Sequence, residues 1–144
     1  MKENWSENEE KKRYLMSYRW AKKQEERILG EIQALRMDKM FPSAVNDGMP
    51  KGSEQRDLSD YAVKLDELIQ ELKEERLEKV RRLKNIEKSI RDLNSEDAQT
   101  IMWLRYIDGL KWEEVCVAIN YEWAQMHRIH GRALREIKIN DDTK

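Results

Sequence analysis

Apolar side chains recur at steps of three and four residues between Asn8 and Met40. Glu25 is the one polar interruption of this spacing, and Leu15 and Leu29 lie beside the apolar stripe. The apolar residues at this spacing are Tyr14, Tyr18, Ala21, Ile28, Ile32 and Leu35. Because residues three and four apart share one face of an α-helix, the pattern predicts a helix over about residues 8–40 with a heptad seam. Such a narrow apolar stripe needs a partner to cover it.

The same spacing returns in the middle of the chain. The spacing is interrupted around Arg76 and Lys79. The apolar residues before the interruption are Leu58, Tyr61, Leu65, Leu68 and Leu72, and those after it are Val80, Leu83, Ile86, Ile90 and Leu93. The pattern predicts a second long helix over about residues 58–93, locally unwound where the heptads give way to one eleven-residue step. An antiparallel hairpin of the two helices is the simplest arrangement, and pairing of the same helices between chains is the alternative.

A linker is expected between these helices. Residues 41–57 contain both prolines of the chain, two glycines and an Asn-Asp-Gly turn. Proline and glycine end helices, so the first helix should stop near Met40 and the second should start near Leu58.

The pattern changes after residue 93, where the apolar spacing breaks into shorter stretches. A polar cap at residues 94–97 precedes helices expected over about residues 96–107 and 112–119, and a third begins near Glu122 or Trp123. Asn120 tolerates the left-handed conformation that a tight turn needs. The third helix is expected to bury Met126, Ile129, Ala133, Leu134 and Ile137. We therefore predict a helical region over residues 1–93 and a helix-turn-helix domain over residues 94–140.

Composition supports an all-α fold. Of 144 residues, 40% are charged and 39% are hydrophobic, and the residues that favour strands are sparse. The net charge of −1 means that any contact with nucleic acid must come from a local basic patch. The charged N-terminus is unlike a signal peptide, no apolar run approaches the roughly 20 residues of a membrane span, and there is a single cysteine. These features predict a cytoplasmic protein with no membrane contact.

The third short helix carries the candidate binding residues. Its outer side is expected to hold Trp123, Ala124, Gln125, His127, Arg128, Arg132, Arg135 and Lys138. A recognition helix places its N-terminal residues at base edges, where glutamine pairs with adenine and arginine with guanine. We therefore expect Gln125, His127 and Arg128 to read bases or clamp a phosphate. The later basic residues should contact phosphates. A merely solvated helix face is the alternative, which the preceding helix and turn make less favourable.

Catalytic and metal chemistry have no support in the sequence. His127 and His130 are three positions apart, but no cysteine or carboxylate stands at a matching spacing for zinc. Cys116 reads as a small core residue, acidic pairs such as Glu113-Glu114 read as solvated faces, and no glycine-rich phosphate loop occurs. We expect no catalytic residue, no metal and no cofactor.

The segment from Leu93 to Ile137 resembles the region-four helix-turn-helix of sigma-70-type factors. The resemblance rests on "LRYIDGL" at 104–110, Glu113-Glu114, and "HRIHGRAL" at 127–134. With the "DGMPKGS" linker and the helical front half, the whole chain is similar to ArpU/RinA-type phage and prophage regulators. Lys111 and Glu122 depart from the motif, because a capping serine or threonine is usual there.

This resemblance implies a sequence-specific, sigma-factor-like transcriptional regulator of prophage genes. The implied partner is double-stranded promoter DNA. The apolar seam of the helical region adds two further candidate partners, which are a second copy of the chain and RNA polymerase or a phage protein. A rival hypothesis is a coiled-coil adaptor that binds RNA polymerase or another protein without reading DNA. A third is a DNA-packaging protein similar to small terminase subunits.

Overall fold

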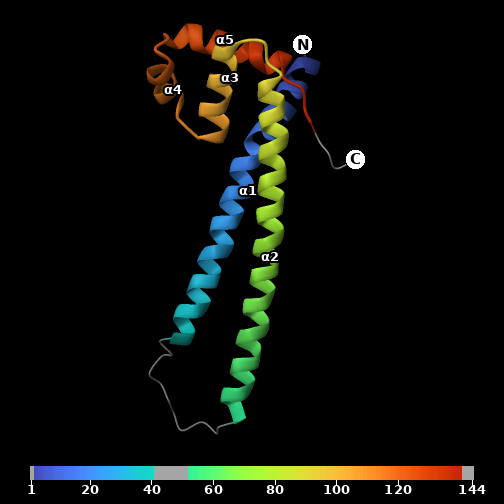
Figure 1. The fold of residues 1–144 in the computed structure, drawn as a ribbon, viewed down its shortest axis with the longest axis vertical. Helices are drawn as coiled ribbons and strands as arrows, with labels where there is room; N and C mark the ends of the chain where they lie inside the picture. Colours follow the sequence, from blue (N-terminus) through green and yellow to red (C-terminus); the bar gives the residue numbers. More distant parts are fainter. Residues whose placement is uncertain (1, 41–51, 141–144) are drawn as a thin grey trace. The chain divides into compact units, whose positions relative to one another are not determined.

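The computed structural model describes residues 2–40 and 52–140 (Figure 1), and every regular element in them is helical. In chain order these are α1 (Lys2–Met40), α2 (Gly52–Arg91), α3 (Glu96–Met102), the π-helical segment η1 (Trp103–Ile107), α4 (Trp112–Ile119) and α5 (Trp123–Glu136). The all-α prediction is confirmed: no strand occurs in those two ranges. No helix described there combines the length and apolar character that crossing a membrane requires.

The long helices extend further than the apolar pattern predicted. Helix α1 begins at Lys2 rather than near residue 8, and α2 begins at Gly52 rather than at Leu58. The predicted linker over 41–57 is therefore wrong at its C-terminal end, while its residues 41–51 lie outside the described residues. The cause is propensity, since Glu54, Gln55 and Arg56 favour helix without contributing an apolar face.

Two compact units emerge from the contacts between residues. Unit 1 comprises Met1–Ala21 and Lys79–Lys144, and unit 2 comprises Lys22–Glu78. The segment predicted as one helical region, residues 1–93, therefore contributes to both units. Within each unit α1 packs against α2 of the same chain and runs antiparallel to it (Figure 1).

Unit 1 surrounds its core with all the short helices and one end of each long helix (Figure 1). Leu15 of α1 and Ile86 of α2 are fully buried there, together with Met102 of α3. The same cluster contains Ile90, Leu93, Ala98, Tyr106, Ala133, Leu134 and Ile137. A second cluster contains Ile101, Val115 and Met126, and it joins α3, α4 and α5. The long helices thus complete the core of the helix-turn-helix.

Polar side chains of the long helices also hold the end of α5. The buried Lys11 donates from Nζ to the carbonyl of Arg135 at 3.0 Å. A cation there suits the negative end of the helix dipole. Just beyond α5, the Ser89 hydroxyl donates to the Lys138 carbonyl at 2.7 Å and lies 2.7 Å from the Tyr14 hydroxyl. The side-chain amide of Asn140 donates to Ser89 at 2.9 Å.

Unit 2 is simpler, because α1 and α2 meet along one seam. Its buried cluster contains Ile28 and Ile32 of α1 and Leu72 of α2, with partly buried leucine and isoleucine side chains around it. Two of the polar interruptions in the apolar pattern form an ion pair, with Arg76 Nε 3.9 Å from a carboxylate oxygen of Glu25. The ion pair therefore places these two polar positions opposite each other in the seam between α1 and α2.

Candidate nucleic-acid interface

Helices α4 and α5 are joined by a tight turn of three residues. At the end of α4, Asn120 adopts the left-handed conformation with φ of 58° and ψ of 42°. The amide of Tyr121 donates to the Cys116 carbonyl at 3.2 Å, which closes the helix end. Helix α5 then starts at Trp123. The predicted sequence of helix, turn and helix is confirmed in its boundaries.

Neither helix of this motif begins with a side-chain cap. Lys111 precedes α4 and Glu122 precedes α5, and neither forms a capping hydrogen bond from its side chain. By contrast, the Ser95 hydroxyl accepts from the Ala98 amide at the start of α3. The start of α5 is therefore held by the packing of the side chains around Trp123.

One face of α5 is buried against the rest of unit 1. Met126 is completely buried and Ala133 nearly so, and Leu134 and Ile137 also belong to the core. Helices α3 and α4 both contact α5. Burial of this face leaves the opposite one turned outward.

The outward face carries most of the predicted binding residues. Exposed side chains there are Trp123, Ala124, Gln125, Arg128, Arg132, Arg135 and, beyond the helix end, Lys138. Helix α5 has three arginines against one glutamate. No ion pair within the described part of the chain engages these arginines or Lys138. The face is therefore a local cationic surface on a chain of nearly zero net charge.

Two of these arginines lie along the helix surface. Arg128 Nε donates to the Ala124 carbonyl at 3.3 Å, and Arg135 Nε donates to the Gly131 carbonyl at 3.4 Å. Each bond uses one of five donors on a guanidinium group. Within the described residues, no other acceptor engages the remaining donors of either group.

His127 is placed differently from the other candidates. Its ring centroid lies 4.9 Å from that of Trp112 and 4.5 Å from that of Trp123. Its Nε2 atom is buried without a hydrogen-bond partner within the residues described. The Arg105 guanidinium lies over the indole of Trp112, 4.4 Å from its ring centroid. His127 thus belongs to an aromatic stack that packs the start of α5 against α4.

His130 lies on the buried side of the helix. Its Nε2 is 2.8 Å from the Tyr106 hydroxyl, and its ring meets Trp112 edge-on with centroids 4.6 Å apart. Burial lowers the pKa of His130 to about 4, helped by the charges of His127, Lys12 and Arg105. Burial also raises the pKa of Tyr106 to about 12. At neutral pH both groups are uncharged, as a core hydrogen bond requires.

Two residues gain importance that sequence reasoning did not assign. Trp112 is one of them, because its indole ring contacts the rings of both His127 and His130. Gly131 lies inside α5, where a glycine destabilises a helix by about 0.5–1 kcal/mol relative to alanine. A glycine inside a predicted helix can be recognised from the sequence, so this residue could have been singled out there. The stack around Trp112 had no such signal, because it joins residues of two helices.

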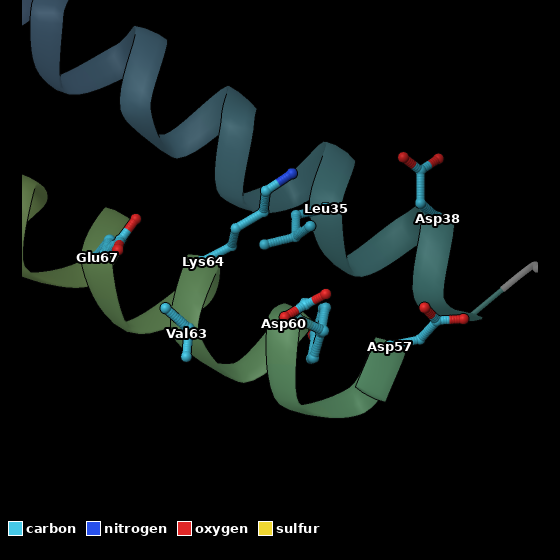
Figure 2. A pocket seen from close by; sticks show the side chains of 8 residues that line it. Leu35, Asp38, Asp57, Asp60, Val63, Lys64 and Glu67 are labelled. Carbon is cyan, nitrogen blue, oxygen red and sulfur yellow. The ribbon is translucent and has the colours of Figure 1, made fainter. Parts of the chain in front are cut away.

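A pocket in unit 2 is lined by none of the predicted binding residues. It has a volume of about 480 Å³, and Figure 2 shows its lining on α1 and α2. The lining residues are Leu35, Asp38, Asp57, Asp60, Tyr61, Val63, Lys64 and Glu67. Four carboxylates against one lysine make this pocket a poor receptor for a phosphate backbone.

Comparison with known proteins places the chain in a family. A family model described as "Protein of unknown function (DUF1492)" matches residues 39–138. The chain belongs to the DUF1492 family. The match covers the helix-turn-helix and every predicted binding residue, from Trp123 to Lys138, of this DUF1492 protein. No curated protein and no solved structure matches it significantly.

Proposed function

We propose that this DUF1492 protein is a sequence-specific DNA-binding transcriptional regulator whose α5 enters the major groove. The observation that carries the proposal is the outward face of α5, which presents Gln125 and three arginines directly after a tight turn from α4. Among residues 2–40 and 52–140, no acidic side chain pairs with these arginines. A major groove about 12 Å wide admits an α-helix. A cationic face on a nearly neutral chain suits a polyanionic partner.

The residues of this face divide into two roles. Gln125 and Arg128 lie in the first half of α5 and suit adenine and guanine edges, respectively. Ala124 is small enough to contact a thymine methyl group. Arg132, Arg135 and Lys138 lie in the second half of the helix or after it and suit phosphates, which position the protein without reading sequence.

His127 has a positioning role in this proposal. Because its ring lies between Trp112 and Trp123, it holds the first turn of α5 instead of facing outward. The half-exposed Trp123, with 50% of its surface accessible, remains available at the leading end of the helix. We therefore assign DNA contact to Trp123 and to the outward residues that follow it.

Resemblance to sigma-70 region four and to ArpU/RinA-type regulators extends the proposal. It implies that the bound DNA is a promoter of prophage genes, and RNA polymerase is a further candidate partner. The turn at Asn120 and the helices on either side of it agree with the expected motif.

Selection of binding sequences from a random duplex pool, with and without RNA polymerase, tests the proposal. On the selected site, Gln125→Ala or Arg128→Ala should each cost about 1–3 kcal/mol of binding free energy. Arg36→Ala is the matched control, since it removes an exposed positive charge from α1 in unit 2. Enrichment of no sequence, or wild-type affinity in both α5 variants, would refute the proposed recognition face.

Salt dependence separates phosphate contacts from base contacts. Arg132→Ala should weaken binding to all duplexes alike and reduce the slope of log K against log salt by about 0.9. An unchanged slope would remove Arg132 from the phosphate set.

A second candidate function is docking to a protein partner without direct DNA readout. It is favoured by Trp20 and Met16, which lie one turn apart on α1 with 61% and 40% of their surfaces exposed. In that case RNA polymerase would be retained by the wild-type chain and lost by Trp20→Ala, while duplex DNA would not be retained. Salt-sensitive retention on duplex DNA favours the regulator instead.

A further inference from the structure

Gly131 lies along α5 between Arg128 and Arg135, at the partly buried edge of the outward face. Counting along the helix by four, three and four residues gives Ala124, Arg128, Gly131 and Arg135, which share one side because those steps return to the same face. Gly131 is therefore flanked by an arginine one turn before it and another one turn after it.

Nothing inside the protein requires a glycine at this position. A Cβ atom built on Gly131 meets no heavy atom within 4 Å, and the residue has ordinary helical geometry. Gly109 is the opposite case: its φ is +75°, and an added Cβ would lie 2.6 Å from Cζ of Arg19. The turn before α4 needs its glycine, whereas α5 would be more stable with an alanine at 131.

We propose that Gly131 is the point where the sugar-phosphate backbone of duplex DNA comes closest to the main chain of α5. This inference rests on the proposed function and deepens it. Charge-assisted bonds from arginine to phosphate need about 2.7–2.9 Å between heavy atoms. A side chain between Arg128 and Arg135 would hold the helix away from the strand that both guanidinium groups contact.

Glycine is suited to such a close approach because it lacks a side chain. The open space beside Gly131 would be filled by the nucleic acid. The site is independent of base sequence, since it concerns the backbone alone.

Gly30 provides a matched control within the same chain. It lies in the interior of α1, is exposed, and has nothing within 4 Å of an added Cβ atom. Substitutions at Gly30 and at Gly131 should therefore have the same effect on folding. Only those at Gly131 should affect binding of DNA.

The experiment measures melting temperature and affinity for a labelled mixed-sequence duplex at low salt. The variants are Gly131→Ala and Gly131→Leu, with Gly30→Ala and Gly30→Leu as controls. Both alanine variants should raise Tm by about 2–4 °C. Gly131→Ala should weaken DNA binding at least about fivefold and Gly131→Leu more, as overpacking of a close contact does. The Gly30 variants should bind like the wild type.

The outcomes separate this inference from the proposal beneath it. If the wild-type chain binds duplex DNA and Arg128→Ala weakens that binding, but both folded Gly131 variants bind normally, the close approach at Gly131 is refuted and the regulator stands. If the wild-type chain does not bind duplex DNA, the proposed function fails and this inference fails with it.

Discussion

Unit 1 and unit 2 are stabilised in different ways. The core of unit 1 draws side chains from both long helices and from the short helices, and buried polar groups such as Lys11 and Ser89 bond to backbone carbonyls. Unit 2 has one seam between two helices, flanked by exposed ion pairs such as Arg27 with Glu31 at 2.6 Å. Exposed ion pairs contribute little to stability, whereas buried hydrogen bonds cost much when broken. The comparison predicts that the same kind of substitution will be more damaging in unit 1.

The largest effect is expected from separating the short helices from the long ones. A fragment of residues 94–144 loses Leu15, Ile86 and Ile90 from its core, so it should show no cooperative thermal transition by circular dichroism. A chain in which a Gly/Ser linker replaces residues 22–78 keeps all of unit 1 and should still melt cooperatively. Cooperative folding of the short fragment would contradict the shared core.

Next in size are single core truncations, one in each unit. Leu15→Ala in unit 1 should lower the free energy of unfolding by about 3–4 kcal/mol, because Leu15 is fully buried among several helices. Leu72→Ala in unit 2 should cost about 1–2 kcal/mol, since the seam borders solvent. Urea denaturation of both variants measures the difference. Equal losses would remove the distinction between the two units.

A pH dependence of about 2–3 kcal/mol should come from His130 in unit 1. Its folded pKa of about 4 lies below the ordinary histidine value of 6.5, so the unfolded chain binds the proton first as the pH falls. The stability present above pH 6.5 is therefore lost progressively between about pH 6.5 and pH 4. His130→Gln, which keeps a polar partner for Tyr106, should flatten this part of the unfolding profile. An identical profile in the variant would contradict the buried neutral histidine.

The smallest effects should come from polar contacts in the two units. Ser89→Ala removes the hydroxyl that donates to the Lys138 carbonyl and bonds to the Tyr14 hydroxyl, and it should cost about 1–2 kcal/mol. Glu71→Gln weakens an exposed ion pair with Arg27 at 3.4 Å and should cost less than about 0.5 kcal/mol. Thermal melts of the two variants compare these costs, and a larger shift for Glu71→Gln would reverse the ranking.

Local patterns in the sequence were sufficient for the helices of the C-terminal region. The polar cap at Ser95, the left-handed turn at Asn120 and the buried face containing Met126 and Leu134 all agree with the structure. Each depends on residues within one or two helical turns of each other. The start of α2 was predicted too late, because residues 52–57 are helical without an apolar face.

Other features were beyond local patterns. Lys11 and Arg135 are 124 positions apart, and no spacing rule connects them. His127 is a polar residue at the start of α5, like its outward neighbours Gln125 and Arg128. Its ring nevertheless packs against the rings of Trp112 and Trp123. The space beside Gly131, where an added Cβ atom would meet no heavy atom within 4 Å, likewise depends on how the other helices pack.

The sequence by itself determined the all-helical fold and the motif of α4, turn and α5, because periodicity and turn chemistry act between near neighbours. Only the tertiary structure decided that both long helices help to build the core of unit 1 and that His127 of α5 packs against Trp112 and Trp123 instead of facing outward. Those outcomes depend on burial, and burial is a property of contacts between segments far apart in the chain.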